Sequence, residues 1–374
     1  MSAALTQLLA HAADRMTVAR RWRAGGHPVV GYVGGDVPVE LLTAAGVLPV
    51  RLAGAPEHDT AVGDRYLGHG VDPSARSILS RLLRDDYGQL DGIVVSRDCE
   101  ASARLFYALR ELRRVEPALA LPPVHLVDIL HLPHHVTTRY VLAKLSELRA
   151  AVETWAGHTI TDADLAEAIA VHDRLRRRLT EVAELRKQLP SRLTGTQALS
   201  VIAATTTMPA QEALELVQKL LEEGTSLPEV VGTRTFLTGS GHDTTAVYAE
   251  LERCGLFVVG EDHDWGELLH HREVGRPTWL ALAERYQHNG PTSPRASIRR
   301  RAEHAEAGAR ACRAETLVSY VRSHDDGPPW DFPAQRAAAG LPAALLECQP
   351  YGGLTTDART AIAEISEPVE EFDE

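Results

Sequence analysis

The feature that most constrains the fold is a repeated unit in which a short apolar run ends in glycine or polar residues and an amphipathic helical pattern follows. In the first unit, the run Pro28–Val33 ends in Gly34, Gly35 and Asp36 and leads into a helical pattern that Gly46 ends. Further runs of this kind are Leu90–Ser96, Thr233–Thr238 and Leu256–Gly260. They lack the alternation of a half-exposed strand, which is typical of parallel strands covered on both faces. Repeated strand–helix units predict an α/β fold with parallel sheets.

These units fall into two groups that a helical stretch separates. We predict an N-terminal α/β domain over residues 1–135, a helical insert over 136–224 and a C-terminal α/β domain over 225–374. In the insert, apolar residues recur three and four positions apart, with Thr161 as an N-cap and Gly224 as a helix end. The predicted fold class is therefore two Rossmann-like, doubly wound parallel-sheet domains with a helical insert between them.

Composition excludes several classes of protein. The chain has 374 residues, of which 44% are hydrophobic and 24% charged, as in an ordinary globular protein. A net charge of −12 argues against a broad nucleic-acid surface. We find no apolar run of about 18 residues that could span a membrane and no secretory signal. The four cysteines are scattered without CxxC spacing, so we expect a reducing, cytoplasmic location.

Polar residues at the strand ends are the candidate site, because ligands of open parallel sheets bind at the carboxyl ends of the strands. We predict a cleft between the two α/β domains, with substrate-binding residues Gly34, Gly35, Asp36 and Ser240. The Gly34-Gly35 turn resembles a phosphate cradle, although it is not a GxGxxG motif. The alternative for each such polar residue is a helix cap or a turn.

Other conspicuous residues have simpler interpretations. We expect the arginine-rich run 174–178 to be a solvated helix face and the acidic end 370–374 to be a solvated tail. Three histidines lack neighbouring cysteines or carboxylates and are expected in an exposed loop: His131, His134 and His135. Three cysteines are expected to be small buried apolar residues: Cys254, Cys312 and Cys348.

Several segments together resemble one known family. The opening VVGYVGGDVPVELLTAAGVLPVRLAG and the segment DGIVVSRDCEASARLFYALREL resemble 2-hydroxyacyl-CoA dehydratases, a family that includes benzoyl-CoA reductase subunits. Later segments, LTGSGHDTTAVYAELERCGLFVVGEDHDWGEL and GLPAALLECQPYGGLTTDAR, continue the resemblance in the same order. It spans roughly residues 28 to 365.

This resemblance implies a function and partners. Members of the family work as pairs of similar subunits on acyl-CoA thioesters and carry [4Fe-4S] clusters held by cysteines. A separate ATP-dependent iron–sulfur activator supplies one electron, and a ketyl radical then permits dehydration or reduction. The resemblance thus implies a cytoplasmic lyase or reductase subunit, paired with a homologous subunit as a heterodimer or with itself as a homodimer.

The ligand positions implied by the resemblance are changed in this sequence. They fall on four residues: Asp72, Cys99, Asp264 and His324. Only Cys99 is a cysteine, so three interpretations stay open. A cluster persists with unusual ligands, the subunit has no cluster and serves as a structural or substrate-binding partner, or the four residues bind a single zinc or iron ion. A sensor of another class is a further alternative. We expect all four residues to converge on the cleft.

Overall fold

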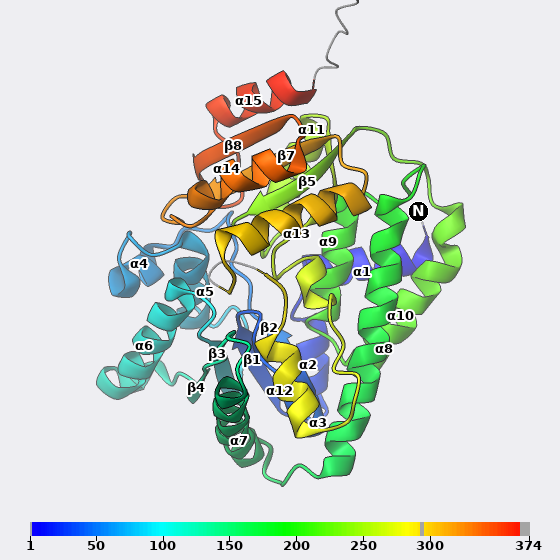
Figure 1. The fold of residues 1–374 in the computed structure, drawn as a ribbon. Coiled ribbons are helices and arrows are strands. Elements are labelled where there is room, and N and C mark those ends of the chain that lie inside the picture. Colours follow the sequence, from blue (N-terminus) through cyan, green and yellow to red (C-terminus); the bar gives the residue numbers. More distant parts are fainter. Residues whose placement is uncertain (1, 292–294, 367–374) are drawn as a thin grey trace, which may run out of the picture.

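The chain forms two four-stranded parallel sheets, which confirms the predicted fold class (Figure 1). The computed structural model describes residues 2–291 and 295–366. The first sheet has the order β2 (Leu48–Arg51), β1 (Val29–Val33), β3 (Gly92–Ser96), β4 (Val124–Val127). The second repeats this order with β6 (Leu256–Glu261), β5 (Thr233–Gly239), β7 (Thr316–Arg322), β8 (Ala343–Gln349). In each sheet the order in which strands are added reverses, between β1 and β3 in the first sheet and between β5 and β7 in the second. Open sheets form ligand crevices at such points.

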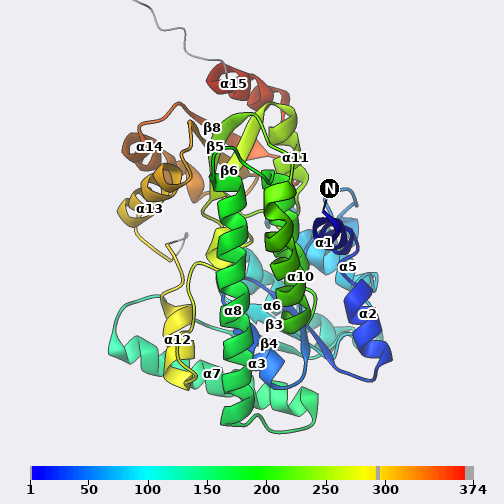
Figure 2. The same ribbon diagram turned by 90° about the vertical axis from the view of Figure 1, so that its right-hand side faces the viewer.

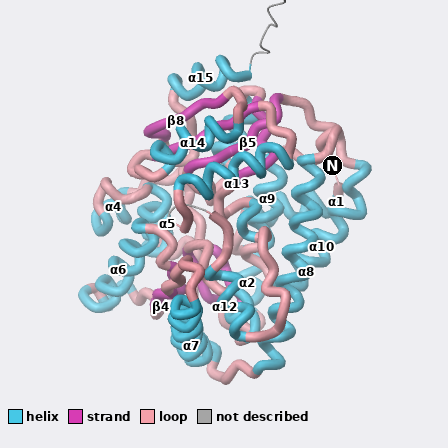
Figure 3. Tube along the Cα trace, viewed as in Figure 1, coloured by secondary structure: helices cyan, strands magenta, loops and turns pink. Residues whose placement is uncertain are grey.

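Helices cover both faces of each sheet, so the strands lie inside and the helices outside (Figure 3). One face of the first sheet packs on α1 (Ala3–Ala13), α2 (Thr17–Ala24), α5 (Pro73–Leu83) and α6 (Glu100–Val115). Its other face packs on α3 (Val39–Ala44), α7 (His135–Ala156) and α12 (Trp279–Gln287). The second sheet packs between α11 (Ala246–Arg253) with α15 (Thr356–Ser366) and α13 (Ile298–Ala311) with α14 (Pro328–Ala339). This two-sided burial explains why the strands are apolar throughout.

The stretch between the sheets is helical, as predicted. The helix α8 (Asp162–Lys187) runs beside α10 (Ala210–Glu223) (Figure 2). The helix α9 (Gly195–Thr205) contacts β6. Thr161 caps α8 through a capping box with Asp164. Gly224 follows α10 in a right-handed conformation (φ −54°), so it does not end the helix through a left-handed residue. The domain limits at 135 and 224 stay a prediction.

The prediction that the arginine-rich run 174–178 forms a solvated helix face is partly wrong. On α8 the side chain of Arg176 is buried, where its guanidinium bonds to Glu40 of α3 and to Asp173. The neighbouring Arg177 is half exposed and pairs with Glu273, as a solvated face requires. Only one side of the arginine run therefore meets solvent.

Three smaller expectations also need correction. His131 is half buried rather than free in a loop, because its Nε2 lies 2.9 Å from the Asp36 carboxylate and its Nδ1 lies 3.1 Å from the Gln287 carbonyl oxygen. Cys312 is buried as expected, whereas Cys254 is half buried and Cys348 is exposed. The tail 370–374 lies outside the described residues.

Within residues 2–291 and 295–366, no helix combines the length and apolar character needed to cross a membrane.

Candidate functional site

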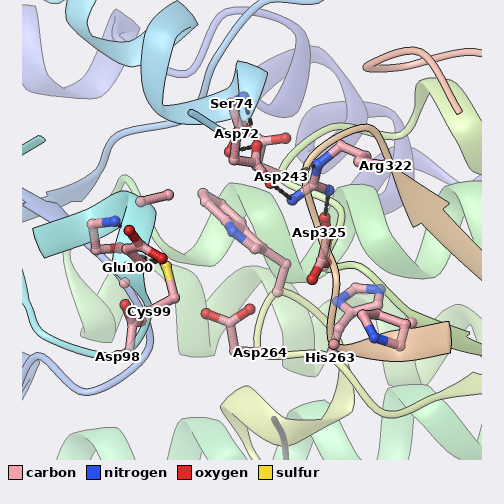
Figure 4. A pocket seen from close by; sticks show the side chains of 18 of the residues that line it. Asp72, Ser74, Asp98, Cys99, Glu100, Asp243, His263, Asp264, Arg322 and Asp325 are labelled. Atoms are coloured by element: carbon pink, nitrogen blue, oxygen red, sulfur yellow. Dashed lines mark hydrogen bonds and ion pairs between the residues drawn. The ribbon is translucent and has the colours of Figure 1, made fainter. Parts of the chain in front are cut away.

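The carboxyl ends of both sheets face one cavity of about 500 Å³ (Figure 4). Its walls are the segments that follow β1, β3, β5, β6 and β7, together with the beginning of α5 and α14. All four residues at the ligand positions line it: Asp72, Cys99, Asp264 and His324. The two sheets thus contribute to a single site rather than to two separate ones.

The residues predicted to bind substrate are divided between the cavity and the protein behind it. Gly34 lines the cavity in a left-handed conformation (φ +94°), and an added Cβ would lie 1.9 Å from Ser96 Oγ. The amide of Gly35 donates to Asp98 (2.7 Å), so this amide is already bonded to a carboxyl side chain. Asp36 and Ser240 are buried outside the cavity lining.

Both of these buried residues have internal partners. Asp36 lies 2.9 Å from His131 Nε2 and 2.9 Å from Arg295 Nη2. The Ser240 hydroxyl donates to Asp325 (2.6 Å) and accepts a bond from the Arg322 amide (3.0 Å). Their side chains therefore support the walls of the cavity.

Asp72 is engaged on both of its oxygens. Oδ1 accepts from the Ser74 amide (2.8 Å) and so caps α5, while Oδ2 accepts from Arg322 Nη2 (2.9 Å; Figure 4). Burial acts to raise the pKa of this carboxyl, but Arg322 and Ser74 outweigh burial and hold it below its usual value. Asp72 is therefore an ionised helix cap in a buried ion pair.

Asp264 is also paired with an arginine, through one of its two carboxylate oxygens. Its Oδ2 accepts from Arg51 Nη2 at 2.5 Å, and the fully buried Arg51 also donates to the Asp264 carbonyl oxygen and stacks on Trp265. Burial again opposes ionisation, yet Arg51 and Arg295 lower the pKa of Asp264. This carboxylate is thus neutralised by a cation that belongs to the other sheet.

Cys99 lines the cavity, and its side chain is bonded to the first turn of α6. Its Sγ accepts from the Ser102 amide (3.4 Å) as the N-cap of α6. Burial, reinforced by the Asp98 charge, raises the pKa of the Cys99 thiol to about 12. The thiol is therefore protonated at neutral pH in the metal-free chain.

Three further residues line the cavity: His324, Asp98 and Asp262. His324 is exposed in a left-handed conformation (φ +73°) after β7. Burial, together with Asp264 and Asp36, raises the pKa of Asp98. Burial raises the pKa of Asp262 to about 7, although a 2.8 Å hydrogen bond from Thr238 acts against it. Asp262 is therefore a cavity residue that can exchange a proton near neutral pH.

Three arginines of the site were not predicted from the sequence: Arg51, Arg295 and Arg322. Arg51 ends β2 and Arg322 ends β7, and at each strand end the charged residue is the only sign of a special role. No motif surrounds Arg295.

The side chains present do not fit a [4Fe-4S] cluster held by this chain alone. Clusters are held by several thiolates, but Cys99 is the one cysteine among the residues that line the cavity. Over the described residues, no three histidine, cysteine or acidic side chains gather closely enough to hold a metal ion. Asp72 and Asp264 instead bond to arginines.

Comparisons with known proteins confirm the family resemblance. Residues 35–331 match the family model described as 2-hydroxyglutaryl-CoA dehydratase, D-component. The (R)-phenyllactyl-CoA dehydratase beta subunit of Clostridium sporogenes is 21% identical over 91% of this chain and 92% of its own. One of the benzoyl-CoA reductase subunits of Thauera aromatica is 23% identical over 66% of this chain and 64% of its own. The (R)-2-hydroxyglutaryl-CoA dehydratase beta subunit of Acidaminococcus fermentans is 21% identical over 70% and 69%, respectively. The chain belongs to the 2-hydroxyglutaryl-CoA dehydratase D-component family.

Proposed function

We propose that this chain is the cluster-free subunit of a 2-hydroxyacyl-CoA dehydratase-like or acyl-CoA reductase-like complex. In this role it binds the acyl-CoA-type substrate in the main cavity, and a homologous subunit holds the iron–sulfur cluster. The observation that carries the proposal is the pairing of Asp72 with Arg322 and of Asp264 with Arg51 at positions where the resemblance implies ligands. An ion pair with an arginine leaves a carboxylate little capacity to bind a metal.

The partner and its chemistry are part of the proposal. The relatives are all named as subunits of dehydratases or of a reductase, which supports a complex of more than one chain. We propose a cytoplasmic heterodimer, served by an ATP-dependent iron–sulfur activator that delivers its electron to the partner subunit. A homodimer is expected when the chain is produced alone.

Within the complex, the proposed contribution of this chain is binding and proton handling. Loss of water from a 2-hydroxyacyl group needs a proton for the departing hydroxyl and a base for the neighbouring carbon. Asp262 lines the cavity and has a pKa of about 7, so it is available in either protonation state near neutral pH. This supports Asp262 as the proton-transfer group of the subunit.

Metal analysis under anaerobic conditions tests the proposal. The chain is purified without oxygen, alone and co-expressed with a homologous family subunit, and iron, zinc and acid-labile sulfide are measured. We expect no bound metal in the chain alone, iron in the complex, and the same iron content after Cys99→Ser, with Cys348→Ser as the matched control.

Two results would contradict it. About four irons in the chain alone, lost on Cys99→Ser, would show that it holds a cluster. One tightly bound zinc or iron, lost on the same change, would show a mononuclear site. Substrate binding is tested separately, by calorimetric titration with acyl-CoA esters.

A further inference from the structure

The main cavity has an excess of acidic side chains. Nine of the residues that line it are aspartate or glutamate, and three are arginines. Each of these arginines already has a carboxylate partner. The pairs are Arg322 with Asp72, Arg301 with Asp331, and Arg295 with Asp36. Among the described lining residues, no arginine or lysine is therefore left to pair with a negatively charged group of a ligand.

Two of the acids are bonded to neutral groups alone. Asp243 accepts from a backbone amide and a tyrosine hydroxyl, and Asp325 accepts from a serine hydroxyl. Both lie beside Arg322 (Figure 4). Burial acts to lower the pKa of Arg322, but Asp72, followed by these two acids, outweighs burial and raises it. One arginine thus faces three carboxylates, and the charge of this part of the wall stays negative.

Gln335 of α14 adds a neutral acceptor without a partner. Its side chain lines the cavity and is 3% exposed. The Thr238 hydroxyl donates to Asp262 (2.8 Å), so its oxygen can only accept a bond from Gln335, whose Nε2 lies 3.0 Å away. This contact fixes the orientation of the amide. The atom left buried without a hydrogen-bond partner among the described residues is therefore Oε1, an acceptor.

A second buried acceptor belongs to Asp98, which follows β3 in the other sheet. Its side chain is 9% exposed and lines the cavity. Oδ2 accepts from the Gly35 amide (2.7 Å), whereas Oδ1 is buried and has no hydrogen-bond partner among the described residues. A buried acceptor without a partner is costly, and a ligand that donates a hydrogen bond removes the cost.

We propose that this cavity selects an acyl group that ends in an ammonium group and rejects one that ends in a carboxylate. The inference rests on the proposed function, which places an acyl-CoA-type substrate in this cavity. An ammonium group carries three donors and a positive charge, so it can satisfy an unpartnered acceptor and offset the excess of carboxylates. A carboxylate has no donor and finds no free arginine, so it would lie unpaired among like charges.

Calorimetry with esters of matched size tests the effect of charge. Butyryl-, 3-hydroxypropionyl- and β-alanyl-CoA differ only in a terminal methyl, hydroxyl or ammonium group, and malonyl-CoA ends in a carboxylate. Their affinities are measured at one pH and salt concentration for the chain, with its homologous subunit where the two form a complex. The CoA phosphates are common to all four esters, so their effect cancels. We expect β-alanyl-CoA to bind about tenfold more tightly than butyryl-CoA and malonyl-CoA about tenfold more weakly, with 3-hydroxypropionyl-CoA close to butyryl-CoA.

Two variants test the assigned acceptors. Gln335→Met removes the free acceptor with little change of shape and should remove most of the advantage of β-alanyl-CoA while leaving butyryl-CoA unchanged. Gln218→Met, on the exposed side of α10, is its matched control. Asp98→Asn keeps an oxygen for the Gly35 amide but loses the charge, so it should weaken β-alanyl-CoA and strengthen malonyl-CoA. Glu100→Gln changes an exposed acid of the same lining and should alter neither affinity.

The outcomes separate this inference from the function on which it rests. If the esters bind but β-alanyl-CoA gains nothing over butyryl- and 3-hydroxypropionyl-CoA, or malonyl-CoA binds as well as they do, the charge selection is wrong while the proposed function stands. An advantage of β-alanyl-CoA that survives both variants would show that Gln335 and Asp98 do not read the ammonium group. Asp98→Asn decides alone if the Gln335 variant does not fold. If no CoA ester binds, the proposed function fails.

Discussion

Cys99 combines two properties that are seldom found together, because it is open to the cavity and yet has a thiol pKa raised to about 12. We predict that iodoacetamide labels Cys99 about a thousandfold more slowly than a free cysteine peptide at pH 7, since the thiolate fraction is smaller by that order. Peptide mass spectrometry on a Cys348→Ser variant, which removes the other exposed thiol, measures the rate. Labelling at the rate of the free peptide would contradict the prediction.

Asp262 provides a second test on a single residue. Burial raises the pKa of its carboxyl from 3.8 to about 7, so the unfolded chain releases this proton at a lower pH than the folded chain. The residue therefore costs stability as pH rises from about 4 to 7. We predict that Asp262→Asn is more stable than the wild type at pH 8, by an amount on the order of 4 kcal/mol at most, and equal to it near pH 4. Urea unfolding at both pH values checks this, and the exposed Asp326→Asn should show no such pH-dependent difference.

At the scale of helices and strands, the buried ion pair between α3 and α8 carries the next prediction. Arg176 bonds to Glu40, whose pKa is held at about 2 against the effect of burial, chiefly by the Arg176 charge. Arg176→Met leaves Glu40 buried without its partner and should lower the free energy of unfolding by about 3–5 kcal/mol. Arg177→Met, one residue along, removes only a half-exposed pair and should cost less than about 1 kcal/mol. Equal effects in urea unfolding would refute this distinction.

The elements that the sequence predicts well are those whose signal is local. An apolar run that ends in Gly34-Gly35 identifies a buried strand without any knowledge of its neighbours. The helix α2 gives no comparable signal, because its arginine-rich sequence buries only Val18 and Ala19. Its burial depends on the sheet it covers, so a short sequence window could not predict it.

The site follows the same rule. The strand ends could be located from the sequence, and the residues following β1, β3 and β6 do line the cavity. The arginines could not be assigned, because Asp72 and Arg322 are 250 positions apart and Arg51 and Asp264 are 213 apart. These distant contacts decide whether an acidic side chain pairs with an arginine. They also decide the direction in which the pKa of Asp72 and of Asp264 shifts.

At the scale of the whole molecule, buried histidines should make the fold sensitive to mild acid. Burial lowers the pKa of His172 and of His263 to about 4, and that of His270 to about 3. The unfolded chain takes up these protons near pH 6.5 and the folded chain does not, so stability falls as pH drops from about 6.5 to 4. The raised pKa values of Asp262 and Asp98 act in the opposite direction, but the lowered pKa values of His242 and His304 add to the effect of these three histidines.

We therefore predict a clear loss of stability between pH 7 and pH 5, with each histidine contributing up to about 1.4 kcal/mol per pH unit. Chemical unfolding at several pH values measures it, and His172→Gln should reduce the slope by about one histidine. A free energy of unfolding that is constant over this range would contradict the prediction.

The two ion pairs at the cavity have a mechanical consequence. Arg51 belongs to the first sheet and Asp264 follows a strand of the second, while Asp72 and Arg322 join the same two halves in the reverse sense. A third link runs from the Gly54 amide to Asp243 (2.8 Å). Because these bonds join the two halves, moving the halves apart would break charged bonds between buried groups, which is costly. The same carboxylates that pair with arginines beside the cavity therefore also hold the two halves of the molecule together.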